Sequence, residues 1–169
     1  MWNSQKVGVL GGGQLGRMLM ESANRLNIQI NILDAANSPA KQISAHENHV
    51  VGSFNEPEAV LKLAETCDVL TAEIEHVDTY ALEKVASKVQ IEPSWRAIRI
   101  IQDKFEQKTH LLKYNIPMAD FRELPTNSRE ELEQIGDILG FPFMLKSRTL
   151  AYDGRGENSF PFLLFIIPS

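Results

Sequence analysis

Three glycines near the start of the chain have a spacing that could support chemistry. Gly11, Gly13 and Gly16 form the pattern G-x-G-x-x-G directly after a short apolar segment. A backbone without side chains can turn sharply there, and its N–H groups can face an anion at the start of a following helix. Asp34 stands 23 residues after Gly11, the spacing of the acid that holds a ribose hydroxyl in dinucleotide sites. The glycines could equally serve only the tight packing of a helix on a strand.

Acidic residues follow a later apolar segment. Glu73 and Glu75 stand two positions apart, with His76 next, directly after residues 69–72. This spacing places both carboxylates on one face of an extended chain, and open α/β sheets bind ligands at the carboxyl ends of their strands. The group could bind a metal ion or hold amino and hydroxyl groups, or it could be a solvated loop with a helix-capping acid. Gln14, at the start of the first helix, could contact a phosphorylated ligand.

A lysine and a glycine-rich loop form a third candidate. Lys146 ends an apolar segment, Arg148 follows it, and residues 152–156 read Tyr-Asp-Gly-Arg-Gly. Cations beside a flexible loop suit a triphosphate. No Gly-Lys-Ser/Thr sequence opens a helix here, so the loop is not a Walker A motif. An exposed basic hairpin turn is the alternative, and Lys104 taken alone is an ordinary surface lysine.

Strands that alternate with helices must position these residues. Short apolar segments predict strands at residues 7–10, 28–33, 49–51, 69–72 and 89–91, with helices between them. The short connections predict a parallel, doubly wound sheet. One set of apolar residues recurs at helical spacing and predicts the buried face of the first helix: Leu15, Met18, Leu19, Ala23 and Leu26. For the second helix, Asn55 with Glu58 predicts a capping box.

The pattern changes after Pro93. Residues 94–114 are largely helical, with a break near 102–103, and Ser128 with Glu131 predicts the start of a further helix. Leu132, Ile135, Ile138 and Leu139 are its predicted buried face.

Two strands and one helix do not close a core, so we expect an incomplete second domain. The predicted boundaries are 1–97, 98–157 and an apolar tail at 158–169. The tail could be a buried final strand or a foreign, sticky end.

Composition excludes several classes of protein. The net charge is −5 and Lys and Arg form no run, which argues against duplex nucleic acid or an anionic membrane as the main partner. The single cysteine, Cys67, excludes an internal disulfide framework and a multi-cysteine metal site. No segment has the ~18 apolar residues of a membrane helix, and the N-terminus lacks a signal-peptide core. We expect a soluble, cytoplasmic protein.

The three motifs together resemble one known family. Residues 9–18, 72–77 and 146–156 are similar, in this order and spacing, to segments of N5-carboxyaminoimidazole ribonucleotide synthetases, which are ATP-grasp enzymes. The similarity is greatest to the synthetase part of fungal phosphoribosylaminoimidazole carboxylases, and it covers about residues 5–156. The resemblance implies an α/β fold, in which a Rossmann-like parallel sheet (the pre-ATP-grasp domain) precedes the start of an incomplete ATP-grasp domain.

The resemblance also implies a reaction of purine biosynthesis. ATP, bicarbonate and 5-aminoimidazole ribonucleotide give the N5-carboxylated product, ADP and phosphate, by way of carboxyphosphate. Such phosphoryl transfer depends on positioning and on charge neutralisation. The Mg²⁺ that the family uses would be held by residues of the part that this chain lacks, so no metal ligand is expected here. The family tends to form homodimers.

Residue matches to the family assign roles to this chain. Gln14 and Glu73 would face the aminoimidazole ribonucleotide. Tyr152, Asp153 and Arg155 would be catalytic, at the bicarbonate end of the phosphates. The ATP-contacting positions would be Lys104, Lys146, Ala151, Gly154, Gly156 and Glu157. On this interpretation Asp34 is an ordinary strand-end acid and no NAD is expected.

The chain departs from the family in two places. Glu157 replaces the usual amide, and residues 158–169 match nothing in the pattern. We therefore expect a truncated chain that does not turn over ATP by itself. Three alternatives stay open: an NAD(P)-binding oxidoreductase, motivated by the glycine pattern and Asp34; a non-catalytic fragment that associates through residues 160–167; and a different ATP-grasp carboxylase.

Overall fold

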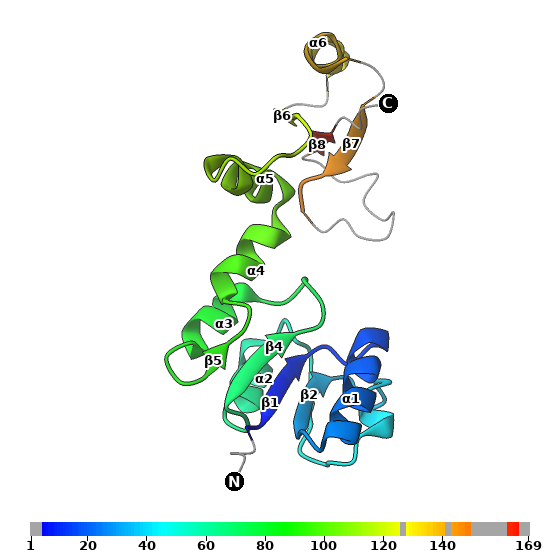
Figure 1. Ribbon diagram of the computed structural model, residues 1–169, viewed down its shortest axis with the longest axis vertical. Coiled ribbons are helices and arrows are strands. Elements are labelled where there is room, and N and C mark those ends of the chain that lie inside the picture. The colour runs from blue at the N-terminus through cyan, green and yellow to red at the C-terminus, as the bar shows by residue number, and fades with distance from the viewer. Residues whose placement is uncertain (1–4, 126–127, 141–142, 150–161, 166–169) are drawn as a thin grey trace. The chain divides into compact units, whose positions relative to one another are not determined.

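The chain forms two compact units that divide between Ile98 and Arg99. The computed structural model describes residues 5–125, 128–140 and 143–149, and the backbone of residues 162–165 (Figure 1). Each unit has its own sheet and its own apolar core. The predicted boundary between residues 157 and 158 lies outside the described residues.

A five-stranded parallel sheet forms the centre of the first unit. Its order is β3-β2-β1-β4-β5, so the chain starts in the middle, builds one side and then crosses to the other. The strands are β1 (Val7–Leu10), β2 (Ile30–Asp34), β3 (Val50–Val51), β4 (Val69–Ala72) and β5 (Gln90–Ile91). The predicted doubly wound α/β sheet is confirmed, and its topological switch point lies between β1 and β4.

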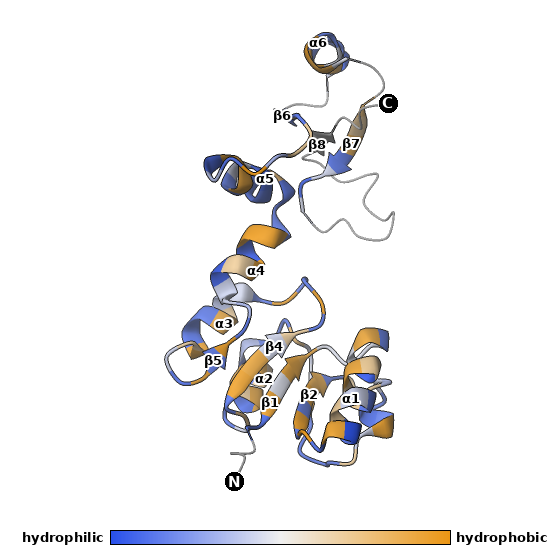
Figure 2. Ribbon diagram, viewed as in Figure 1, coloured by the Kyte–Doolittle hydropathy of each residue, from blue (hydrophilic) through white to orange (hydrophobic). Residues whose placement is uncertain are grey.

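Helices cover both faces of this sheet because successive strand residues point to opposite sides. Val9 packs with Met20 of α1 (Gln14–Leu26). Its neighbour Leu10 packs with Val60 of α2 (Pro57–Ala64) and Leu82 of α3 (Thr79–Val85). Apolar residues therefore dominate β1 and β4, as Figure 2 shows in orange. A short 3-10 helix, Lys41–Ile43, follows β2.

The predicted buried face of α1 is wrong except at Ala23, which is buried. Leu15, Met18, Leu19 and Leu26 are 40–69% exposed, and the residues that α1 buries are Gly16, Met20 and Ala23. Both sets recur at helical spacing, so periodicity alone does not choose between them. Gly16 decides the orientation, because a Cβ built on it would lie 3.1 Å from the carbonyl oxygen of Gly11. The helix can approach the strand–helix turn this closely only on its glycine side.

Capping explains where the next helices begin. Asp78 accepts hydrogen bonds from the backbone N–H groups of Tyr80 and Ala81 and so starts α3. The capping box predicted at Asn55 does not form. The N-cap of α2 is Glu56, which makes no side-chain cap bond, and Pro57 begins the helix. Proline suits this first position because its missing N–H would have no helical partner there.

Two consecutive helices follow β5, and the division between the units falls within the first of them. The break predicted near 102–103 is present: α4 (Trp95–Gln102) ends before Asp103, and Asp103 caps α5 (Lys104–Lys113). β6 (Phe121–Leu124) follows. Ser128 then accepts a hydrogen bond from the N–H of Glu131 and starts α6 (Arg129–Leu139), as predicted. The remaining strands are β7 (Met144–Ser147) and β8 (Phe162–Phe165).

A three-stranded sheet, in the order β6-β8-β7, organises this unit. α5 and α6 lie on different sides of it (Figure 1). On one face Phe121 meets Phe105 of α5, with ring centroids 5.6 Å apart. On the other face Leu124 packs with Ile135 of α6. Ile138 was predicted to be buried but is 63% exposed, because the contacting side of α6 is formed by Ile135, Leu132 and Leu139.

Four residues of the apolar tail occupy the centre of this sheet. The backbone of β8 pairs antiparallel with β6 on one side and with β7 on the other. Of the two alternatives for the tail, these residues therefore adopt the final strand. Among the helices described, none is both long and apolar enough to cross a membrane.

Candidate functional site

Glu73 and the glycine turn meet at the switch point of the first sheet. The N–H of Glu73 donates to the carbonyl of Leu10 over 3.1 Å, which places the end of β4 beside the end of β1. The carboxylate of Glu73 then accepts a hydrogen bond of 3.0 Å from the N–H of Gly13. Gly11 has a φ of 98°, and a Cβ there would lie 2.8 Å from Cγ of Glu73. Only glycine at this position leaves room for the side chain of Glu73.

Asp34 engages the neighbouring amide of the turn. Its carboxylate accepts hydrogen bonds of 2.6 Å from the N–H of Gly12 and 2.6 Å from the N–H of Ala35. Two successive loop amides, those of Gly12 and Gly13, thus bind carboxylates of the protein itself. A dinucleotide pyrophosphate would need these N–H groups and would meet two negative charges there. This geometry argues against the NAD(P) alternative and agrees with a structural role for Asp34.

Lys41 and His49 bind backbone groups of β2 and β3, and no sequence motif indicated Lys41. The ammonium group of Lys41 donates to the backbone oxygens of Asp34 and Val50 over 2.6 and 2.8 Å. Burial lowers the pKa of Lys41, and the charge of Asp34 opposes that shift. Nδ1 of His49 accepts from the N–H of Ile32 over 3.0 Å, and burial, followed by the charge of Lys41, lowers the pKa of His49.

The remaining predicted residues of this edge are partly exposed. Gln14 is exposed at the first position of α1, beside the glycine turn. Oε1 of Glu75 lies 3.6 Å from Nε2 of His76, which makes them a loose pair. Within the described part of the chain, no three acidic, histidine or cysteine side chains form a group that could hold a metal ion. This edge therefore offers hydrogen-bonding groups, Glu73 and Gln14, to a polar ligand.

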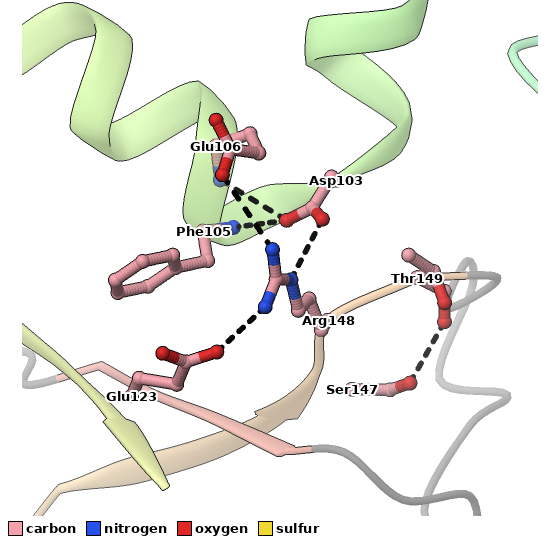
Figure 3. A network of polar contacts seen from close by, with 7 residues as sticks. All are labelled: Asp103, Phe105, Glu106, Glu123, Ser147, Arg148 and Thr149. Atoms are coloured by element: carbon pink, nitrogen blue, oxygen red, sulfur yellow. Dashed lines mark hydrogen bonds and ion pairs between the residues drawn. The ribbon is translucent and has the colours of Figure 1, made fainter. Parts of the chain in front are cut away.

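A second group of functional candidates lies in the second unit, around Arg148 (Figure 3). Nε of Arg148 donates to Asp103 over 2.6 Å, and its NH1 group donates to Glu123 over 2.6 Å. NH2 lies 3.6 Å from Glu106. The hydrogen bond to Asp103 is the main reason that the pKa of Arg148 is raised. The guanidinium carbon lies 5.3 Å from the ring centroid of Phe105.

Arg148 also joins the segments that carry the two predicted ATP lysines. Its carbonyl accepts a hydrogen bond of 2.9 Å from the N–H of Lys104, the first residue of α5. Lys146 is exposed on β7, two residues before Arg148. Burial and then the charge of Lys146 lower the pKa of Lys108, so these two cations are neighbours. Sequence reasoning missed Lys108, because one lysine among several on a polar helix carries no distinguishing signal.

The other predicted site residues lie outside the described residues: Ala151, Tyr152, Asp153, Gly154, Arg155, Gly156 and Glu157. The roles assigned to them, and those assigned to Gln14, Glu73, Lys104 and Lys146, stay predictions. The half-buried thiol of Cys67 is not a nucleophile candidate, because desolvation raises its pKa to about 11.

Comparison with known proteins identifies relatives of both units. Residues 4–102 match the family model of the ribonucleotide synthetase preATP-grasp domain, and residues 109–160 match that of the ATP-grasp domain. A phosphoribosylaminoimidazole carboxylase of Candida albicans is 56% identical over 158 residues, which are 92% of this chain and 28% of the relative. An N5-carboxyaminoimidazole ribonucleotide synthase of Staphylococcus haemolyticus is 34% identical over 89% of this chain and 40% of its own length.

Solved structures give the same result. A carboxyaminoimidazole ribonucleotide synthase of Aspergillus clavatus, complexed with ATP, has a TM-score of 0.92 and 64% identity, covering 99% of this chain and 48% of that one. The Aspergillus clavatus N5-carboxyaminoimidazole synthase in complex with ADP and 5-aminoimidazole ribonucleotide has a TM-score of 0.85 and 67% identity, covering 100% of this chain and 42% of that one.

These matches confirm the resemblance that the sequence motifs indicate. The chain spans 28% of the length of the Candida albicans carboxylase and 48% of a solved synthase chain. The ribonucleotide synthetase model alone accounts for more than half of the chain, from residue 4 to residue 102. The chain therefore belongs to the ribonucleotide synthetases whose preATP-grasp domain is followed by an ATP-grasp domain.

Proposed function

We propose that this chain provides the N-terminal part of an enzyme that carboxylates 5-aminoimidazole ribonucleotide in purine biosynthesis. Bicarbonate takes the γ-phosphoryl group of ATP and gives carboxyphosphate and ADP. The amino group of the ribonucleotide then attacks the carboxyl carbon, or the CO2 released from it, and phosphate leaves. The observation that supports this most is the 67% identity, over 100% of this chain, to a synthase solved with ADP and that ribonucleotide.

The first unit would contribute to the ribonucleotide site. Glu73 presents a carboxylate at the switch point, where open α/β sheets bind their ligands. The bond to Gly13 fixes one carboxylate oxygen of Glu73. The other oxygen and the exposed amide of Gln14 can then bind amino and hydroxyl groups. A carboxylate at this position suits a neutral amine and disfavours a pyrophosphate.

The second unit would contribute to the site for ATP. Lys104, Lys146 and the neighbouring Lys108 are cations on two adjoining elements, and a triphosphate is the ligand that such an arrangement favours. Mg²⁺ would neutralise phosphate charge when bound. The described residues include no group that fits it, so its ligands would come from elsewhere in the whole enzyme. We place the enzyme in the cytoplasm and expect a homodimer.

Thermal unfolding of the purified chain tests the ribonucleotide site. A ligand at 100 times its Kd adds about 2.7 kcal/mol to the free energy of unfolding, which raises the Tm of a domain of this size by several degrees. We expect that shift with 5-aminoimidazole ribonucleotide and none with NAD. A shift with NAD alone would support the oxidoreductase alternative and contradict the proposal.

Two variants test whether Glu73 contributes to the rise in Tm that the ribonucleotide causes. Glu73→Gln keeps the size of the side chain and an oxygen that can accept from Gly13, so the Tm without ligand should change little. The shift caused by the ribonucleotide should shrink, because the amide lacks the negative charge. Glu21→Gln, an exposed residue of α1 paired only loosely with Arg17 at 3.3 Å, is the matched control and should keep the full shift. An equal shift in Glu73→Gln would exclude Glu73 from the site.

A further inference from the structure

Arg148 is the shared partner of three acids in the second unit, and the residue matches to the family assign it no contact with a ligand. Its side chain is 25% exposed and that of Asp103 is 21% exposed, so their ion pair is largely shielded from solvent. Asp103 uses its other carboxylate oxygen to cap α5, accepting from the N–H groups of Phe105 and Glu106. Arg148 thus contacts the group that starts α5, and its own carbonyl binds the next N–H, that of Lys104.

The geometry points to Arg148 as a positioning residue for the triphosphate of ATP: it joins the end of β7 to the start of α5, which places Lys146 and Lys104, and its charge compensates the acids beside them. The choice of ATP as the ligand rests on the proposed function. The role of Arg148 in joining β7 to α5 is independent of that function.

The sheet register places these charges on one face. Glu123 of β6 and Lys146 of β7 are both paired with position 163 of β8. Residues in one row across a sheet point to the same side, and Arg148 follows Lys146 by two positions, which keeps it on that side. The guanidinium group thus lies among Asp103, Glu123 and Glu106, within 3.6 Å of each, on the face that carries Lys146. Without it, a triphosphate at Lys146 would meet uncompensated carboxylates.

Lysine could not replace this arginine. Arg148 makes two bonds of 2.6 Å, through Nε and NH1, to acids that belong to different elements. A guanidinium group presents these donors in a rigid planar fork and can also stack on an aromatic ring, here Phe105. An ammonium group is a single point charge on a flexible stem, so Arg148→Lys would keep the charge but would not join the elements.

Amide hydrogen exchange of the full chain tests the joining of the segments without ATP. In Arg148→Met we expect exchange at residues 104–106 to accelerate about tenfold. Their acceptors, the carbonyl of residue 148 and the carboxylate of Asp103, remain but are no longer held in place by the guanidinium group. Arg148→Lys should accelerate exchange to a similar extent. The control is Arg129→Met, which removes an exposed arginine that bonds Glu133 on α6 over 2.7 Å and should leave residues 104–106 unchanged. Unchanged exchange in Arg148→Met would overturn the proposal.

Protection of lysines by ATP tests the electrostatic role. In the unaltered chain, ATP should slow acylation of Lys104 and Lys146 by an N-hydroxysuccinimide ester, followed by mass spectrometry, but not acylation of Lys62. Arg148→Met should need about five times more ATP for half-protection, the scale of one partly exposed ion pair. Adding Glu123→Gln to Arg148→Met should restore part of the protection, which a purely structural defect would not allow.

The two measurements separate the proposal from the function on which it rests. Equal ATP requirements in Arg148→Met and the unaltered chain would overturn the role toward ATP. No protection in the unaltered chain would contradict the ATP site of the proposed function. The exchange data would then still decide whether Arg148 joins β7 to α5.

Discussion

Replacement of Gly11 by alanine should disturb Glu73 more than it disturbs the fold. Gly11 has a φ of 98°, a conformation that alanine adopts with strain. The added Cβ would lie 2.8 Å from Cγ of Glu73 and 2.9 Å from Oε1. Cγ is close to the backbone and cannot move aside unless the whole side chain changes rotamer. The substitution should therefore break the hydrogen bond between Glu73 and Gly13.

The expected loss in free energy of unfolding is the sum of the backbone strain at residue 11 and the lost hydrogen bond to Glu73. The positive φ costs about 1–2 kcal/mol for a residue with a Cβ. Loss of the bond from Gly13 to a half-buried carboxylate adds about 1–2 kcal/mol, so Gly11→Ala should cost about 2–4 kcal/mol in total. In a Glu73→Ala background there is no Cγ to collide with and no bond left to lose. The same substitution should then cost only the strain, which gives a coupling of about 1–2 kcal/mol.

Urea unfolding followed by the fluorescence of Trp95 measures these costs in the first unit. Trp95 packs against the core that contains Leu10 and Leu82, and a Trp2→Phe background removes the second of the two tryptophans. Gly140→Ala is a reference for strain alone, because Gly140 also has a positive φ, of 82°, but nothing lies within 4 Å of its Cβ position. Gly140 belongs to the second unit, so the unfolding of this variant is followed by far-UV circular dichroism instead. If Gly11→Ala lowers the free energy of unfolding by the same amount with and without the Glu73 side chain, the proposed collision is refuted.

Three further outcomes are expected. Burial raises the pKa of Cys67 from 9.0 to about 11, so the folded state disfavours the thiolate. The contribution of the protonated thiol to the free energy of unfolding is complete below pH 9 and is lost as the pH rises through 11. Urea unfolding of Cys67→Ser should lack this part of the pH dependence. Met20→Ala should cost about 2–5 kcal/mol in urea unfolding because Met20 is fully buried, whereas Leu26→Gln should cost less than about 0.5 kcal/mol because Leu26 is 69% exposed. Asp78→Ala should lower the free energy of unfolding in urea by about 1 kcal/mol, because Asp78 caps α3, while Asn55→Ala should have almost no effect, because Asn55 does not cap α2.

Local signals in the sequence predicted most of the secondary structure. Asp78 and Ser128 start helices because a side-chain oxygen binds an N–H two or three residues later, and such contacts depend only on neighbours in the chain. The strands of the first sheet were found for a similar reason, since buried parallel strands are short apolar segments. Asn55 shows the limit of a local pattern, because Glu56 and Pro57 provide an equally acceptable helix start one residue later.

The orientation of the first helix could not be derived in this way. Leu15, Met18 and Leu26 form an apolar stripe, but Gly16, Met20 and Ala23 form another at the same period. The choice depends on how closely the helix approaches the turn after β1, which is a contact between segments. The place of residues 162–165 is likewise a tertiary property, since their two partner strands lie on either side of β8 in the sheet but far from it along the chain.

By itself, the sequence determined the family and the order of the elements, and it indicated candidate residues for ligand binding. All of these follow from residue types and their spacing along the chain. Only the tertiary structure decided which groups those residues engage. The amides of Gly12 and Gly13 bind Asp34 and Glu73, and Arg148 lies among three acids from α5 and β6. Hydrogen bonds and ion pairs between residues 22 to 60 positions apart depend on the folding of the whole unit, and no local pattern encodes them.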